Sequence, residues 1–296
     1  MYISIQALLV LLLLSSFIWL LLRSKSSRSD GILVKNVHPY RKAMIQLMPT
    51  VSMSQASLSY KLDIQPSLDF IDKHKGERDI TLSHIAIAAI NHALQQNSEI
   101  DRFISGGRMY QRKNRSISFS VKKTKMDQKA ALGTVKIDLR DDENFFDLCD
   151  RINDKITQER SIKPTSLDME YKLLSKLPTP VLSALIRLGY LLNTLNLLPS
   201  VLVKNDMMHT SALLANFGTL GMPAANHHLY DWGTCPIFIA IGDVTDEIYE
   251  CEGQYKTKKS LDVIFNFDER ISDGLTAWNA ILSGLKTLEQ PEKYYL

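Results

Sequence analysis

The chain has 296 residues, of which 45% are hydrophobic and 23% are charged, and its formal net charge is +3. This composition is typical of a globular protein with a sizeable core, and the charge is too small to indicate a nucleic-acid partner. Three cysteines lie far apart, and no Cys or His cluster has the spacing of a metal site. We therefore expect a reducing compartment and no bound metal.

The N-terminus carries a nearly continuous apolar run, ISIQALLVLLLLSSFIWLLL, from residue 3 to residue 22. At about 1.5 Å per residue, a helix of this length spans roughly 30 Å, the thickness of a bilayer core. We expect residues 1–22 to form one transmembrane anchor. A cleaved secretory signal is the alternative, but it would have basic residues before the run and a shorter apolar core.

Basic residues flank the anchor on one side only. Arg23, Lys25 and Arg28 follow it, and no Lys or Arg precedes it. The positive-inside rule then predicts that the C-terminal domain is cytoplasmic, in agreement with the cysteine content. We expect a polar linker over residues 23–36 and a single folded domain over residues 37–296.

After the linker, the hydrophobic pattern alternates between the periods of strands and helices. It predicts an α+β fold in which helices pack on a mixed sheet. The expected helices cover residues 38–48, 67–76, 81–97, 142–161 and 276–291. The expected strands lie within residues 54–64, 108–124 (two strands around a turn), 129–141, 209–221, 235–244 and 260–269.

The segment from residue 178 to residue 199 is very apolar, yet it contains Arg187 and two asparagines and is bounded by prolines. A second membrane span is one interpretation. We favour a buried helix or a helix that lies against the domain or the membrane surface.

Two motifs make the order of elements specific. ANFGTLG (residues 215–221) resembles an S-N-x-G-x-x-G turn, and FDERISDG (residues 267–274) resembles an F-D-H-R-x-x-D-G strand end. With RKAMIQLM near residue 41, they give residues 37–292 a resemblance to the catalytic domain of dihydrolipoyl acyltransferases of 2-oxo acid dehydrogenase complexes. That domain shares its fold with chloramphenicol acetyltransferase. The resemblance implies this fold, acyl-CoA as co-substrate, and homotrimers with sites between subunits.

The resemblance also implies roles for individual residues. The family's histidine, a general base, corresponds to Glu269. The family's aspartate, held through an arginine, corresponds to Asp273, with Gly274 after it and Arg41 as a possible partner. The family's turn retains its substrate-binding positions as Asn216 and Gly218, whereas Ala215 replaces the hydroxyl residue that helps to hold the oxyanion.

Glu269 is an unusual base, because the unperturbed pKa of glutamate is about 4.3 whereas that of histidine is about 6.5. Burial would have to raise its pKa into the working range. The alternative interpretation is that Glu269 is a solvated or ion-paired charge at a strand end.

A substitute base is offered by NHHLYDWGTCP, in which His227 and His228 precede Asp231. A histidine beside a carboxylate is a usual arrangement for a general base. The alternative is a loop that packs at a subunit contact. His209 flanks a strand and has no partner visible in the sequence.

These observations predict a membrane-anchored, CoA-dependent acyltransferase whose partners are the bilayer, through residues 3–22, acyl-CoA and an unknown acceptor. The alternative is a catalytically inactive, membrane-tethered scaffold or binding protein that retains the fold. Glu269 and Ala215 favour the scaffold, and Asn216 and Asp273 favour a retained ligand site.

Overall fold

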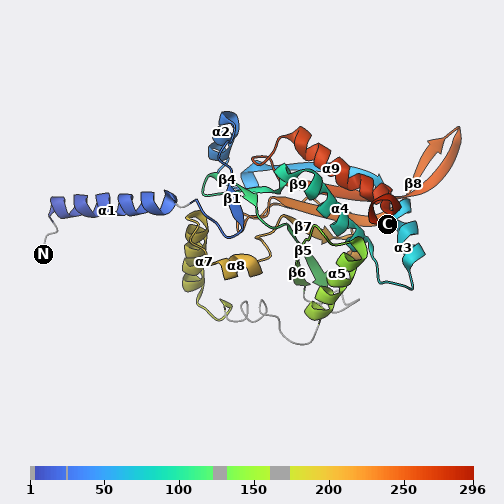
Figure 1. Cartoon of the computed structure of the whole chain (residues 1–296), viewed down its shortest axis with the longest axis horizontal. Helices are drawn as coiled ribbons and strands as arrows, with labels where there is room; N and C mark the ends of the chain where they lie inside the picture. Colours follow the sequence, from blue (N-terminus) through green and yellow to red (C-terminus); the bar gives the residue numbers. More distant parts are fainter. Residues whose placement is uncertain (1–3, 25, 123–131, 161–173) are drawn as a thin grey trace.

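The computed structural model describes residues 4–24, 26–122, 132–160 and 174–296. A single helix, α1 (Ile5–Ser24), projects from a folded body of sheets and helices (Figure 1). In the part of the chain that the structure describes, one segment, Ile5–Arg23, is long and apolar enough to cross a membrane, and none of it is buried.

The body is organised around a six-stranded sheet in the order β2-β9-β8-β7-β5-β6. Strand β7 is parallel to both of its neighbours, and every other pair is antiparallel, so the predicted mixed sheet is confirmed. The strands are β2 (Gln55–Asp63), β5 (Ser116–Lys122), β6 (Leu132–Asp138), β7 (Ala212–Asn216), β8 (Ile237–Cys251) and β9 (Gln254–Asp268).

Helices cover one face of this sheet. The central helices α4 (Leu82–Gln96) and α9 (Gly274–Glu289) pack closely on each other, because Gly284 of α9 lies against the backbone of Ala89. Thr81 begins α4 with a capping box in which His84 takes the reciprocal position. The remaining helices are α2 (Pro39–Leu47), α3 (Gln65–His74), α5 (Phe145–Arg160), α7 (Thr179–Thr194), α8 (Ser200–Asn205) and α10 (Pro291–Tyr295).

The opposite face of the sheet is covered by the loop before β8. Leu229 and Cys235 of this loop are buried against Leu213, Phe238 and Ile264 of the strands. This second apolar cluster fixes the loop that carries His227 and His228 to the sheet, so the position of both histidines is determined by packing.

A second, three-stranded sheet lies near the C-terminal end of α1 and has the strand order β1-β4-β3. Its strands are β1 (Gly31–Leu33), β3 (Arg102–Ser105) and β4 (Arg108–Arg112). Strand β1 belongs to the segment expected to be a linker. Arg28, in the same segment, is buried, and its guanidinium binds the side chains of Asp30, Ser105 and Asn196. The folded body thus begins before residue 37.

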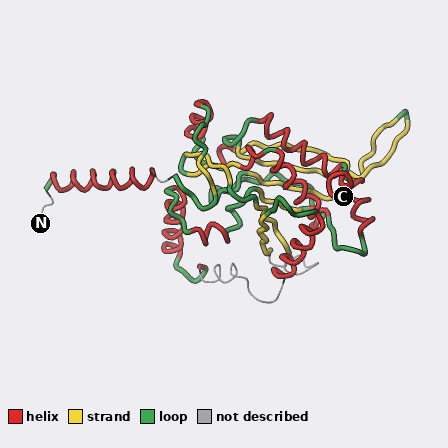
Figure 2. Tube along the Cα trace, viewed as in Figure 1, coloured by secondary structure: helices red, strands yellow, loops and turns green. Residues whose placement is uncertain are grey.

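Strands β8 and β9 are longer than their apolar cores predicted. Beyond Val244 they continue as a hairpin that extends away from the body (Figure 2) and turns at Glu252 and Gly253, both with positive φ. The hairpin is mostly polar, with Asp246 opposite Lys259 and Glu247 opposite Lys258. For this reason its sequence carries no clear period-two signal.

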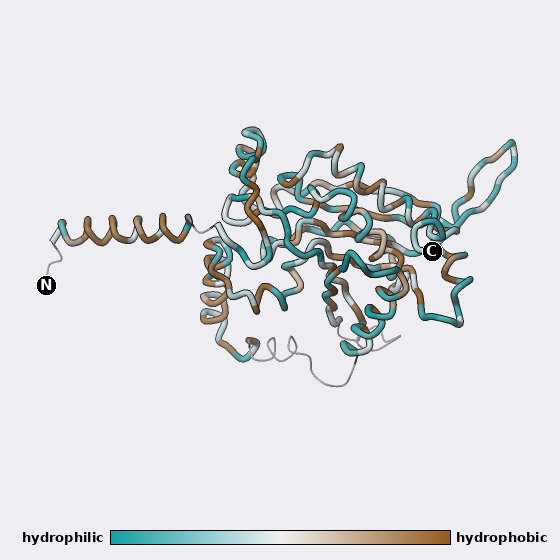
Figure 3. The backbone as a smooth tube through the Cα atoms, in the orientation of Figure 1, coloured by the Kyte–Doolittle hydropathy of each residue, from teal (hydrophilic) through white to brown (hydrophobic). Residues whose placement is uncertain are grey.

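The apolar segment 178–199 forms α7, which has 16 residues and is shorter than the roughly 20 that a spanning helix needs. The segment is hydrophobic along much of its length (Figure 3). Most of its apolar side chains are exposed, as are those of α8 after it. The exposed residues are Val181, Leu185, Ile186, Leu188, Tyr190, Leu191, Val201 and Leu202. The interpretation as a surface helix therefore fits the structure, whereas a buried helix does not.

Candidate functional site

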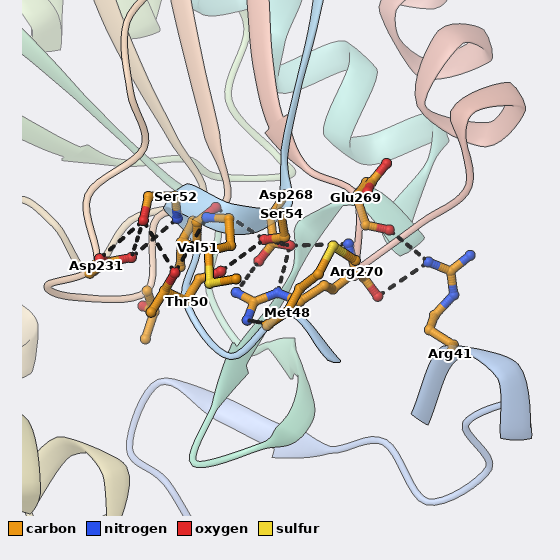
Figure 4. Close-up of polar contacts among 12 residues, drawn as sticks. Arg41, Met48, Thr50, Val51, Ser52, Ser54, Asp231, Asp268, Glu269 and Arg270 are labelled. Carbon is orange, nitrogen blue, oxygen red and sulfur yellow. Dashed lines mark hydrogen bonds and ion pairs between the residues drawn. The ribbon is translucent and has the colours of Figure 1, made fainter. Parts of the chain in front are cut away.

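The charged run at the end of β9 is built around a buried ion pair (Figure 4). Asp268 and Arg270 are each 1% exposed, and the Arg270 guanidinium binds both carboxylate oxygens, with Nε–Oδ1 at 2.9 Å and Nη2–Oδ2 at 2.7 Å. Ser54 donates to Asp268 Oδ1 at 2.8 Å, and Arg270 donates to the Met48 carbonyl. These contacts tie the strand end to the chain before β2.

Glu269 lies between these two buried residues. Its N–H donates to the Ser54 carbonyl, and its own carbonyl accepts from Arg41 Nη1 at 2.9 Å, so the backbone is held on both sides. The side chain is half-buried and points away from the Asp268–Arg270 pair (Figure 4). No hydrogen bond or ion pair to its carboxylate is found among the residues that the structure describes. This carboxylate is therefore free to accept a proton or orient a ligand.

Asp273 is the N-cap of α9 and accepts from the Thr276 N–H at 2.8 Å. This hydrogen bond, with a smaller effect from the positive charge of Arg41, lowers the pKa of the Asp273 carboxyl below its usual value. Arg41 itself binds the carbonyls of Glu269 and Arg270. Arg41 and Asp273 share a polar cleft of about 440 Å³. A hypothetical Cβ at Gly274 would meet no atom within 4 Å, so packing does not require a glycine there.

The second predicted half of the site is the turn after β7. The Asn216 amide donates to Ser83 Oγ at 2.9 Å, and its carbonyl oxygen accepts from the Thr219 N–H at 3.2 Å. Gly218 is required by close packing, because a Cβ would lie 2.4 Å from the Gly242 carbonyl oxygen. Ala215 offers no hydroxyl. The Asn216 side-chain amide binds the hydroxyl of Ser83, and the Asn216 backbone carbonyl accepts from the hydroxyl of Thr219. Sequence reasoning missed Ser83, since it lies more than 130 residues earlier in the chain.

Within one chain, the turn after β7 and the end of β9 lie far apart. Asn216 pairs with Ile241, and Ile241 pairs with Val263 of β9. Glu269 lies six residues beyond Val263, or roughly 20 Å at about 3.3 Å per residue. Asn216 and Glu269 therefore stand at opposite ends of the sheet.

His227 and His228 lie on the sheet face that the helices leave open. The His227 ring stacks on Phe238 at 4.1 Å between centroids, and its Nδ1 lies 2.8 Å from the His228 carbonyl oxygen. His228 is exposed and contacts Tyr230 edge-on. Asp231, expected as their carboxylate partner, instead accepts from the backbone and hydroxyl of Ser52 (Figure 4). That expected pairing is wrong.

His209, for which the sequence showed no partner, has one in the structure. Its Nδ1 lies 3.1 Å from Asp206 Oδ2, and Trp232 Nε1 donates to the same oxygen at 2.6 Å. The spacing of three residues between Asp206 and His209 was the sequence signal that could have indicated this pair.

No group of three or more His, Cys, Asp or Glu able to hold a metal occurs within the described ranges.

No protein-family model matches the chain, and no curated protein matches its sequence. Solved structures do match. A probable dihydrolipoamide acetyltransferase from Listeria monocytogenes has a TM-score of 0.57 and 14% identity, with 87% of this chain and 94% of that chain covered. Chloramphenicol acetyltransferase has a TM-score of 0.55 and 10% identity, with 87% and 99% covered.

A third similar structure is the dihydrolipoamide acetyltransferase of Azotobacter vinelandii, with a TM-score of 0.58, 13% identity, and 90% and 95% covered. In that enzyme, the roles of a serine, a histidine and an asparagine in the catalytic mechanism have been investigated. Identities this low establish the architecture of the chain and not its chemistry. The chain has the fold shared by dihydrolipoamide acetyltransferase catalytic domains and chloramphenicol acetyltransferase.

Proposed function

We propose that the protein is a membrane-anchored acyltransferase that uses acyl-CoA at a site shared between two copies of the chain. The observation that carries this proposal is the separation of Asn216 from Glu269 at opposite ends of the sheet. A second copy can bring the β7 end of one chain to the β9 end of another, and a closed ring of copies completes every site equally. The resemblance to the acetyltransferase fold favours a homotrimer.

In this proposal, Glu269 is the general base. The histidine and asparagine studied in the Azotobacter vinelandii enzyme are four positions apart, as are Glu269 and Asp273 here. The unpaired Glu269 carboxylate would take the proton of a thiol or hydroxyl acceptor, whose oxygen or sulfur then attacks the thioester carbonyl and releases the CoA thiol. Arg41 binds the Glu269 carbonyl, and Asp273 caps the helix that follows.

Ser83 supplies the hydroxyl that Ala215 lacks. Its Oγ accepts the Asn216 amide at 2.9 Å, so its own O–H remains available to donate to a developing oxyanion. The side chain is half-buried at the start of α4. Asn216 thereby orients the hydroxyl while the Thr219 N–H orients Asn216.

The membrane setting follows from α1 and α7. We infer that residues 1–22 anchor the chain, that residues from Arg28 onward form the catalytic domain, and that Arg23, Lys25 and Arg28 keep this domain cytoplasmic. In Figure 1, α7 lies near the C-terminal end of α1 and runs across the direction of α1. A helix that lies in the plane of the membrane–water interface would have this orientation relative to a spanning helix. The acceptor would then be membrane-bound.

Thiol release from a panel of acyl-CoAs tests the proposal, with full-length protein in lipid nanodiscs. Glu269→Gln keeps the shape of the side chain and removes the base, so kcat should fall by about 100-fold or more. His228→Ala, a control on the exposed loop, should leave kcat within about threefold. Loss of activity in His228→Ala with Glu269→Gln unaffected would assign the base to the loop instead.

The alternative is a non-catalytic binding protein. It is favoured by the Asn216 side chain, whose amide and carbonyl are both bonded within the chain. Under this alternative, no acyl-CoA releases its thiol with any acceptor, including membrane lipids, and Glu269→Gln changes only binding.

A further inference from the structure

A polar cavity of about 320 Å³ lies near the C-terminal end of α1, away from the β7 turn and the end of β9. It is lined by the segment after α1, the β4–β5 connection, β6, α8 and His209, which lies three residues before β7. The lining residues that carry charge or a polar group are Ser29, Asp30, Arg112, Lys113, Asn114, Ser116, Lys136, Asp138, Ser200, Lys204 and His209. Two valines of α8 complete the wall.

The charge around the cavity is not balanced. Four cationic side chains line it and two carboxylates oppose them, which leaves an excess of two positive charges with His209 neutral. One of the carboxylates, Asp30, is already bound by Arg28 at 2.8 Å. An excess of positive charge in a concave site strengthens the electrostatic attraction of an anion to that site.

Buried polar atoms without a hydrogen-bond partner gather at the same place. Within the described parts of the chain, the buried side-chain atoms of this kind are His209 Nε2, Arg112 Nε and Asp101 Oδ1. His209 and Arg112 both line the cavity. Arg112 Nε and Asp101 Oδ1 form an ion pair with each other at 3.3 Å, so His209 Nε2 is the one of these three atoms with neither a hydrogen bond nor an ion pair in the described ranges. His209 is 2% exposed. A buried donor or acceptor left unpaired is unfavourable, and such groups mark sites that a ligand completes.

Lys136 adds a cation that is fixed in place. Its ammonium donates to the carbonyls that follow α8, with His209 O at 2.7 Å and Asp206 O at 3.0 Å. Burial, followed by the positive charge of Arg112, lowers the pKa of Lys136 to about 8. An anion in the cavity would favour the charged form of this lysine.

We propose that this cavity binds a phosphate ester. A phosphate monoester carries close to two negative charges at neutral pH and so matches the excess of two positive charges. Arg112 contributes its positive charge to the wall of the cavity, although its Nη2 already donates to the Thr234 carbonyl at 2.6 Å. His209 Nε2, which has no hydrogen-bond partner in the described ranges, is the ring atom that would bind a phosphate oxygen. The volume exceeds that of phosphate alone, and Ser29, Asn114 and Ser200 are placed for hydroxyl groups of the ester.

The position of the cavity allows two sources for this group. Ser29 and Asp30 follow the membrane helix by a few residues, and Val201 of α8 is 67% exposed. If α1 spans the bilayer, the cavity faces the headgroup layer, so the phosphate belongs either to a lipid headgroup or to a soluble ester that shares its chemistry.

Isothermal titration calorimetry of full-length protein in phosphate-free dodecyl maltoside micelles tests the proposal, with glycerol 1-phosphate and dihexanoyl phosphatidic acid as probes. We expect one molecule bound per chain. Lys113 and Lys204 are exposed at the cavity rim, so Lys113→Gln combined with Lys204→Gln should weaken binding by about tenfold or more without unfolding the protein. Phosphatidic acid bound at least about tenfold more tightly than glycerol 1-phosphate would indicate a lipid headgroup; equal affinities would indicate a soluble ester.

The matched control is Lys256→Gln combined with Lys286→Gln, which removes the same charge from exposed positions on the hairpin and on α9. This control should change affinity by less than about twofold. His209→Gln, checked for folding by circular dichroism, should also weaken binding. Absence of saturable binding by both probes, or an equal loss in both lysine pairs, would overturn the proposal.

Discussion

At the scale of single residues, the Asp268–Arg270 ion pair determines the geometry of the β9 end. Both side chains are 2% exposed and joined by two hydrogen bonds. Removing one partner from such a pair leaves a buried charge uncompensated, and this effect is much larger than the loss of an exposed pair. The backbone of Glu269 is held between these residues, so its position depends on the pair.

Asp268→Asn should lower the free energy of unfolding by about 3–5 kcal/mol, because it leaves the positive charge of Arg270 buried without a partner. Asp150→Asn is the matched control, since it breaks an ion pair with Arg78 in which the side chains are 57% and 37% exposed. Its effect should stay below about 1 kcal/mol. Urea unfolding of full-length protein in micelles measures both, and equal effects would contradict the assignment of Asp268 as a buried structural anion.

Asp101 gives a pH-dependent prediction. Burial, opposed by the charge of Arg112, raises the pKa of Asp101 to about 6. The folded chain then holds a proton between about pH 4 and pH 6 that the unfolded chain has released, so this residue contributes stability at low pH that is lost as pH rises. Relative to Asp101→Asn, the wild type should gain about 2 kcal/mol on going from about pH 7 to pH 4. Parallel stability curves for the two proteins would mean that Asp101 titrates normally.

At the scale of elements, Arg28 joins the segment after α1 to the small sheet and α7. Its guanidinium binds Ser105 Oγ at 2.8 Å, Asn196 Oδ1 at 2.9 Å and the side chain and carbonyl of Asn193. No other residue in this segment makes as many described contacts with α7, so the end of that helix should depend on it.

Arg28→Gln should therefore loosen the C-terminal turn of α7 and raise hydrogen exchange at residues 193–197 by about tenfold or more, since buried charge-assisted hydrogen bonds are lost. A chain shortened to begin at residue 30 should show the same change. Arg187→Gln is the control on the exposed side of the same helix, and α4 is the internal reference. Unchanged exchange at the end of α7 would show that the helix is held by other contacts.

The elements also show how far the sequence could predict the structure. The helix α4 was predicted from its helical periodicity, and the apolar parts of β8 and β9 were predicted from their short apolar runs. The polar hairpin beyond Val244 and the three-residue strand β1 carry no such periodicity. The Asp231–His pairing failed for another reason: the sequence places Asp231 near the histidines, but the folded chain places it closer to Ser52. Contacts between distant segments, such as Ser83 with Asn216, need the tertiary structure.

At the scale of the whole molecule, the exposed apolar side of α7 and the direction of α1 are consistent with a body that rests on the membrane surface. Leu188 of α7 is 49% exposed, and Tyr255, near the tip of the β8–β9 hairpin, is 81% exposed. The hairpin lies at the end of the body farthest from α1 (Figure 1). In a Cys251→Ser background, an NBD label at Leu188→Cys should be quenched by doxyl lipids and one at Tyr255→Cys should not. Equal quenching at the two sites would place α7 away from the bilayer.

Assembly is tested by mixing two inactive variants. If each site takes Asn216 from one copy and Glu269 from another, Asn216→Ala and Glu269→Gln chains damage opposite halves of a shared site. Copies combined at random in equal amounts then form intact sites about one time in four, whatever the number of copies in the ring, so co-expressed variants should regain about a quarter of wild-type thiol release.

Each variant alone should stay inactive at the same protein concentration. If both residues served a site within one chain, every chain in the mixture would carry a defect and no activity would return. Because the roughly 20 Å between the two residues follows from strand register, recovery is the outcome that the fold predicts.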